Sequence, residues 1–248
     1  VSCCGGGVWT VPAKHYGADL AAMLQAVTDN TRLIFIANPN NPTGTRVGAS
    51  ELLPFLQAVP EHVWVVLDEA YLEYVEDADH LNGATVLAQF PNLIVTRTFS
   101  KIYGLAAVRF GYSVSSPAFA DLLNRARQPF NVNGLAMAAV MAALEDDDYV
   151  AQSIALNRAG MKQMTEGLTT LGYDFIPSAG NFVAFDCGES GSDLFQRMLR
   201  EGVIVRAIAE YGLPNHVRVS IGLAAENERF LAVLAKVGAK AAGSGAGN

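Results

Sequence analysis

The chain has 248 residues, of which 51% are hydrophobic and 17% are charged, and its formal net charge is −7. The apolar content excludes a chain that is disordered throughout, the lack of a basic stripe argues against a nucleic-acid partner, and no apolar run approaches the ~18 residues that span a membrane. A charge content below the roughly 25% usual for soluble domains favours an oligomer that buries part of its surface.

The first part of the sequence, up to about Ser115, alternates short apolar runs with helical patterns. We expect strands at Val8–Val11, Leu33–Ala37, Val63–Leu67, Leu93–Thr96 and Phe110–Val114. We expect helices between them at Asp19–Val27, Ala49–Ala58 and Leu81–Phe90. Strands that are apolar on both faces and separated by helices indicate a mostly parallel sheet with both faces covered. The predicted fold class is therefore α/β, in which ligand sites gather at the carboxyl ends of the strands.

The pattern changes beyond residue 115. We expect helices at Pro117–Arg127, Leu135–Leu144, Tyr149–Leu171, Ser192–Glu201 and Glu226–Val237, and strands at Phe182–Asp186, Val203–Arg206 and Val217–Ile221. The acidic run Glu145–Asp148 is typical of a solvated helix N-terminus. These elements predict a large domain over residues 1–145, a smaller α+β domain over 146–240, and a disordered tail over 241–248.

Cysteine and histidine usage points to a reducing compartment and away from a metal site. The three cysteines are odd in number and include the adjacent pair Cys3 and Cys4, which disfavours a disulfide scaffold. The four histidines show no metal-ligand spacing, so we expect no metal. The sequence also has no basic segment followed by an apolar leader, and we therefore expect a cytoplasmic location.

Polar residues follow two of the expected strands. Asn38-Pro39-Asn40-Asn41-Pro42-Thr43-Gly44 comes directly after Leu33–Ala37, and its Asn-Pro steps force extended or turn backbone that leaves Asn side chains facing outward. Asp68-Glu69-Ala70-Tyr71 closes the run Val63–Leu67, where a carboxylate is costly unless it meets a cation or a donor. The alternatives are an ordinary strand-to-helix loop for the first cluster and a helix N-cap by Asp68 for the second.

A third polar cluster begins at Thr98-Phe99-Ser100-Lys101. Lys101 is the single lysine between Lys14 and Lys162, and it lies among apolar residues and hydroxyls. Removal from water favours the neutral amine, which is a nucleophile toward a carbonyl. Arg109 follows eight residues later and, with nearby hydroxyls, offers donors for a phosphate. Taken by itself, a lysine near an arginine says little, and a solvated surface is the default interpretation.

Together the three clusters resemble the fold-type-I pyridoxal-phosphate aminotransferases, and among them the histidinol-phosphate aminotransferase family. The motifs at 38–44 and 68–71 and the Ser-Lys pair followed by Arg109 occur in the family's order. The stretches 127–133 and 211–222 are similar as well, and the resemblance runs from about residue 8 to residue 237. It implies pyridoxal 5'-phosphate as the cofactor, bound by the large domain. It also implies an amino donor and a 2-oxo acid as substrates, and a homodimer with sites at the interface.

The resemblance further implies catalytic roles for Lys101, Asp68 and Tyr71, and a cofactor-binding role for Asn41. Lys101 would hold the cofactor covalently and then act as general acid and base. Asp68 would pair with the pyridine nitrogen and keep it protonated. Tyr71 and Asn41 would hydrogen-bond the phenolic oxygen of the cofactor.

Binding roles are implied for five other residues. Thr98, Ser100 and Arg109 would contact the cofactor phosphate. Arg218 would bind a substrate carboxylate or, with histidinol phosphate, lie near the carbinol end. Arg206 would lie close to the substrate phosphate. A surface ion pair is the alternative interpretation for both Arg206 and Arg218.

The resemblance also implies a part of the fold that this sequence does not contain. Family members begin with a further stretch that includes the Gly-rich turn around the cofactor phosphate, and we expect on the order of a hundred residues of it to be absent here. The leading prediction for the activity is a histidinol-phosphate:2-oxoglutarate aminotransferase of histidine biosynthesis. An aromatic-amino-acid aminotransferase, a decarboxylase of the same fold and a truncated, non-catalytic remnant are left open.

Overall fold

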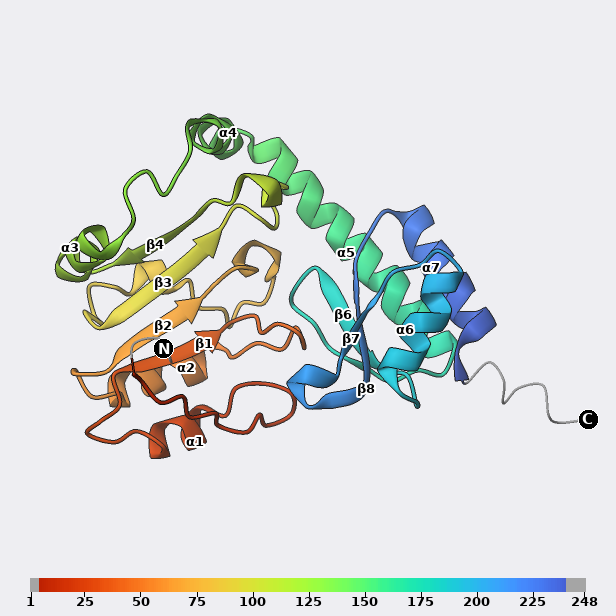
Figure 1. Ribbon diagram of the computed structural model, residues 1–248, viewed down its shortest axis with the longest axis horizontal. Helices are drawn as coiled ribbons and strands as arrows, with labels where there is room; N and C mark the ends of the chain where they lie inside the picture. The colour runs from red at the N-terminus through yellow and green to blue at the C-terminus, as the bar shows by residue number, and fades with distance from the viewer. Residues whose placement is uncertain (1–4, 240–248) are drawn as a thin grey trace, which may run out of the picture.

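The computed structural model describes residues 5–239, which are arranged around two four-stranded sheets (Figure 1). The first sheet has the order β1-β2-β3-β4, and its strands are Leu33–Ala37, Trp64–Asp68, Leu93–Thr98 and Gly111–Ser115. β1, β2 and β3 are parallel, and β4 runs antiparallel to β3. The predicted mostly parallel α/β sheet is therefore confirmed.

Two helices cover one face of the first sheet. α1 (Leu20–Gln25) and α2 (Ala49–Ala58) pack against the side chains that point to this face, such as Ile34 and Ile36. Side chains alternate along a strand, so the remaining residues of β1 point to the other face. There Leu33 and Phe35 are 43% and 59% exposed. The expectation that both faces are covered is wrong for β1, because α1 and α2 both pack on the same face.

The second sheet is antiparallel throughout and has the order β5-β6-β8-β7. Its strands are, in chain order, Phe175–Ile176, Phe182–Asp186, Arg206–Ile208 and Leu213–Ser220. Three helices pack with it around one apolar core: α5 (Asp147–Thr170), α6 (Gly191–Arg200) and α7 (Ala224–Val237). This arrangement confirms the smaller α+β part of the fold. The division at residue 145 stays a prediction, and the tail 241–248 lies outside the described residues.

Three helices in succession connect the two sheets. α3 (Pro117–Ala126) packs on β4, α4 (Gly134–Leu144) lies at the outer edge, and α5 runs from there across to the second sheet (Figure 1). Asp146, in the acidic run, caps α5 by accepting a hydrogen bond from the backbone N–H of Tyr149. The run is thus the N-terminus of a helix, as predicted. Within residues 5–239, no helix is both long and apolar enough to cross a membrane.

Three expected elements differ from the structure. Val8–Val11 forms no strand, and Val8 and Trp9 are 69% and 83% exposed. Leu81–Phe90 holds only the short 3₁₀ helix η3 (Gly83–Thr85) and turns, in which the N–H groups of Thr85 and Val86 donate to carbonyls three residues back. The strand expected at Val203–Arg206 begins only at Arg206, because the pairing with β8 starts there.

Candidate active site

Five of the seven expected cofactor-binding residues meet at the carboxyl ends of β2 and β3, whereas Asn41 and Tyr71 are not part of the cavity lining there. An open cavity of about 400 Å³ lies there, and its lining includes Asp68, Thr98, Ser100, Lys101 and Arg109. β2 ends at Asp68 and β3 at Thr98. The strands are parallel, so both ends open on the same rim of the sheet.

A carboxylate and an amine are available within this cavity. The carboxylate of Asp68 is exposed and accepts a hydrogen bond from the backbone N–H of Ala70 at 3.1 Å. Lys101 lies on the loop after β3 and is partly exposed, with its Nζ 5.2 Å from the centre of the Tyr71 ring. The pair can hold a cationic ring nitrogen and react with a carbonyl carbon.

Anion donors form another part of the cavity wall. The backbone N–H of Ser100 donates to Oγ1 of Thr98 at 3.1 Å, and Nη1 of Arg109 lies 3.5 Å from Oγ of Ser100. Arg109 has a φ of 57°, in the left-handed region, which costs roughly 1–2 kcal/mol for a residue other than glycine. Such strain is concentrated at functional sites. Two hydroxyls beside a guanidinium make a donor set that suits a phosphate.

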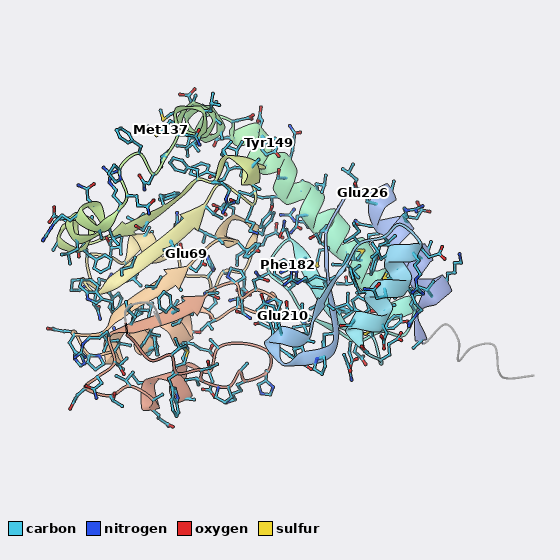
Figure 2. All side chains as sticks on the ribbon, viewed as in Figure 1. Glu69, Met137, Tyr149, Phe182, Glu210 and Glu226 are labelled. Atoms are coloured by element: carbon cyan, nitrogen blue, oxygen red, sulfur yellow. The ribbon has the colours of Figure 1, made fainter. Side chains whose placement is uncertain are left out.

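A row of contacts joins the second sheet to this cavity. The buried ring of Tyr71 meets Phe182 edge-on at 5.3 Å, and the guanidinium of Arg218 lies over Phe182 at 5.0 Å. Nη1 of Arg218 then donates to Oδ1 of Asn41 on the loop after β1. Phe182 is labelled between the two sheets in Figure 2. The structure therefore brings Asn41, Tyr71, Lys101 and Arg218 together, although they come from four separate segments.

Arg206 is not part of the cavity lining. It lies on β7 directly opposite Arg218 of β8, and its Nη2 donates to Oε1 of Glu210 at 2.5 Å. This hydrogen bond lowers the pKa of Glu210. Two like charges in cross-strand positions are unfavourable unless an anion compensates them, which Glu210 does in part. The predicted contact of Arg206 with a substrate phosphate stays a prediction.

Sequence reasoning missed a buried ion pair at the same strand ends. Glu69 and Arg97 are joined at 2.8 Å, with side chains that are 1% and 15% exposed. Burial raises the pKa of Glu69, against the effect of hydrogen bonds from Gly83 and Arg97. Burial lowers the pKa of Arg97, but Glu69 and Tyr112 together outweigh it and leave that pKa above its usual value. The available signal was Arg97, which directly follows the apolar run of β3. A charged residue that is buried in this way requires a counter-ion.

Comparison of the sequence with known proteins identifies an aminotransferase family. The sequence profile of "Aminotransferase class I and II" matches residues 1–234. Histidinol-phosphate aminotransferase 2 of Pseudomonas fluorescens is 62% identical over 231 residues, which are 93% of this chain and 62% of the relative. Histidinol-phosphate aminotransferase 1 of Nitrosococcus oceani is 56% identical over 227 residues, 92% of this chain and 61% of that protein.

A solved structure shares the fold over the same range. Histidinol-phosphate aminotransferase from Sinorhizobium meliloti, in complex with pyridoxal-5'-phosphate, superposes with a TM-score of 0.87 at 36% identity, covering 94% of this chain and 64% of that one. The chain thus spans about 62% of the length of the curated relatives it matches. On these grounds the chain belongs to the class I and II aminotransferase family.

Proposed function

We propose that the protein is a pyridoxal-phosphate-dependent aminotransferase that moves the amino group of histidinol phosphate to 2-oxoglutarate in histidine biosynthesis. The observation that carries the proposal is the shared cavity, in which the carboxylate of Asp68, the amine of Lys101 and the guanidinium of Arg109 face one space. The names of the relatives that are 62% and 61% identical support the choice of amino donor.

The donor set of the cavity fits pyridoxal phosphate. That molecule has a ring nitrogen that takes up a proton, an aldehyde and a phosphate. Asp68 offers a carboxylate, Lys101 an amine, and Thr98, Ser100 and Arg109 offer two hydroxyls and a guanidinium. When bound, the cofactor supplies an electron sink for the negative charge that develops at the substrate Cα.

The catalytic work then falls to four side chains. Asp68 is the counter-ion that keeps the proton on the ring nitrogen. Lys101 would hold the cofactor through Nζ, with the aldehyde oxygen leaving as water, and its free amine would remove and return the proton at the substrate Cα. Tyr71 and Asn41 hold the phenolic oxygen.

The remaining residues bind the cofactor phosphate, the substrate phosphate, and the carboxylate or carbinol end of the substrate. Thr98, Ser100 and Arg109 hold the cofactor phosphate. Arg218 binds the carboxylate of the 2-oxo acid through its planar fork of donors, or lies beside the carbinol end of histidinol phosphate. Arg206, opposite Arg218 on the neighbouring strand, attracts the substrate phosphate.

A homodimer is part of the proposal. An apolar surface on and before α4, here called the α4 patch, is formed by Phe130, Leu135, Met137, Met141 and Leu144, all more than half exposed. No charged residue occurs between Arg127 and Glu145. A two-fold contact brings identical surfaces together, so an uncharged patch is what a chain with a net charge of −7 needs for self-association. We infer that a second copy covers it.

We also propose that the protein works in the cytoplasm. Cys187 is a free, buried thiol, and the adjacent Cys3 and Cys4 do not suit a disulfide framework. Cysteine usage of this kind is typical of proteins in a reducing compartment.

The test is an end-product assay with the protein, pyridoxal phosphate, histidinol phosphate and 2-oxoglutarate. We expect glutamate to form in step with the loss of 2-oxoglutarate. Release of carbon dioxide without glutamate would support a decarboxylase instead, and a preference for an aromatic amino donor would support the aromatic enzyme. If the protein neither binds the cofactor nor forms product, the non-catalytic alternative holds.

A further inference from the structure

Two adjacent carboxylates at the end of β2 lie on opposite faces of the first sheet. Asp68 is exposed and lines the cavity, whereas the side chain of Glu69 is 1% exposed. The alternation of side chains along an extended chain explains the difference. Glu69 is labelled against the first sheet in Figure 2. The proposed function uses Asp68 and leaves the buried Glu69 without a role.

Every oxygen of the buried carboxylate is engaged by a donor from another segment. Oε1 of Glu69 accepts from the backbone N–H of Gly83 at 2.6 Å. Oε2 accepts from Nε and Nη2 of Arg97 at 3.0 and 2.8 Å. Nη2 of Arg97 also donates to Oδ1 of Asn82 at 2.6 Å. Because a buried ion pair is costly unless it is fully hydrogen-bonded, this geometry describes a completed clamp between the end of β2, β3 and the start of η3.

The backbone around the two carboxylates is held from both sides. The N–H of Asn38 donates to the carbonyl of Asp68 at 2.9 Å, and the N–H of Glu69 donates to the carbonyl of Thr96 at 2.9 Å. Gly83 lies so close that a Cβ there would come within 3.1 Å of Oε1 of Glu69. The turn that directs Asp68 into the cavity is thus fixed one residue later by a side chain on the other face.

We propose that Glu69, held by Arg97, is a positioning residue for Asp68. The clamp prevents the end of β2 from rotating, which keeps the Asp68 carboxylate aimed at the ring nitrogen of the cofactor. It also pairs the guanidinium of Arg97, a residue that lines the same cavity as Asp68, with the buried carboxylate of Glu69. The inference rests on the proposed function and deepens it, because Glu69 acts only through Asp68.

A double-substitution cycle on cofactor affinity tests this role. The Kd of pyridoxal phosphate is measured by absorbance titration for the unaltered protein, Glu69→Gln, Asp68→Asn and the double variant. Gln keeps the shape of Glu69 and an acceptor for Gly83 but loses the ion pair. We expect Glu69→Gln to raise Kd about tenfold when Asp68 is present and less than about twofold in the Asp68→Asn background, a coupling within the range for groups that act as a unit. In the half-reaction with the amino donor, kcat should fall while KM stays within about threefold, as expected for a misplaced catalytic group.

Glu76→Gln is the matched control. It makes the same chemical change in an exposed ion pair with Arg158, outside the cavity. We expect it to leave Kd unchanged. Arg97→Lys, which keeps both charges but loses the two-pronged donor, should reproduce the direction of the Glu69→Gln effect.

The outcomes separate the inference from the function on which it rests. If the unaltered protein binds no pyridoxal phosphate, the proposed function fails. If it binds and Asp68→Asn weakens binding, but Glu69→Gln behaves like Glu76→Gln or adds its full effect to Asp68→Asn, only the positioning role is overturned. If Glu69→Gln and Arg97→Lys both lose the native far-ultraviolet circular dichroism signal, the pair is needed for folding rather than positioning, and the inference is again wrong.

Discussion

Two neighbouring carboxylates at the end of β2 differ in their hydrogen-bond partners. Asp68 and Glu69 are both carboxylates, yet Glu69 has its hydrogen-bonding capacity filled by Gly83 and Arg97, and Asp68 is left open to the cavity. A carboxylate with few protein partners on a concave surface is available to an incoming cation. This contrast in partners, rather than a contrast in chemistry, makes Asp68 the candidate counter-ion.

Replacement of Asp68 by Asn tests that assignment. We expect Asp68→Asn to retain pyridoxal phosphate at saturating concentration, because the phosphate donors and Lys101 are unchanged. The half-reaction should slow by several orders of magnitude, since the neutral amide cannot hold the ring nitrogen in its protonated form. Rapid-mixing absorbance measurements with the amino donor give the rate, and the exposed Asp29→Asn serves as the control. A rate close to that of the unaltered protein would remove Asp68 from its role.

The sequence predicted the open half of the candidate site better than the buried half. Asp68 and Lys101 could be predicted at one rim, because each follows an apolar run and the ends of parallel strands lie together. The pairing of Glu69 with Arg97 depends on the register between β2 and β3, and the contact of Tyr71 with Phe182 depends on how the two sheets meet. Neither the ion pair nor the ring contact can be predicted from the local sequence.

At the scale of elements, the predicted helices and strands agree with the structure where the local sequence pattern is sufficient to specify them. α2 forms at Ala49–Ala58 as predicted, and the prediction for α4 is correct to within one residue. Long apolar or amphipathic patterns specify such elements largely by themselves. At Leu81–Phe90 the helical pattern gives only one 3₁₀ turn, capped by Asn82, followed by turns with i→i+3 hydrogen bonds. Val8–Val11 has the apolar composition of a strand but pairs with no strand among residues 5–239.

The 3₁₀ helix η2 (Leu72–Tyr74) carries a pH-dependent contact between the two sheets. Burial, followed by the charge of Glu73, raises the pKa of Tyr74 to about 12, although a hydrogen bond with Asn181 opposes the shift. A folded-state pKa above the unfolded value means that the associated stability is complete below pH 10 and is lost as the pH rises toward 12. The sign therefore predicts alkaline destabilisation through this residue.

Tyr74→Phe should remove this pH dependence. Allowing for its partial exposure, Tyr74 should account for a fall of about 1–2 kcal/mol in the free energy of unfolding between about pH 10 and 12. Urea unfolding across that interval measures the difference between the unaltered protein and Tyr74→Phe. The exposed Tyr211→Phe is the control. Parallel losses of stability in the unaltered protein and Tyr74→Phe would contradict the prediction.

At the scale of the molecule, the candidate site is assembled from both halves of the chain. Asp68, Lys101 and Arg109 belong to the first sheet and its loops, and Arg218 reaches Asn41 from the second sheet. α5 links the two sheets, and Arg158 on this helix pairs with Glu76 beyond η2. The distance between the proposed substrate-binding and cofactor-binding groups is therefore set by how the two sheets sit against each other.

The α4 patch leads to a prediction about assembly. We expect a dimer by analytical ultracentrifugation at micromolar concentration. Leu135→Glu places a charge in the patch and should raise the dimer dissociation constant by at least about tenfold. Ile204→Glu, at a residue 77% exposed on the second half of the chain, should leave the dimer intact. A monomer in the unaltered protein, or a dimer unaffected by Leu135→Glu, would show that the patch has another role.

The central claim is that one amine, that of Lys101, reacts with the aldehyde of the cofactor. The direct measurement is to incubate the protein with pyridoxal phosphate, reduce it with borohydride, and locate the added mass on peptides by mass spectrometry. We predict modification at Lys101 in near-stoichiometric yield, with the other lysines largely unmodified and the mass absent from Lys101→Ala. Equal labelling of all lysines, or none at Lys101, would contradict the account.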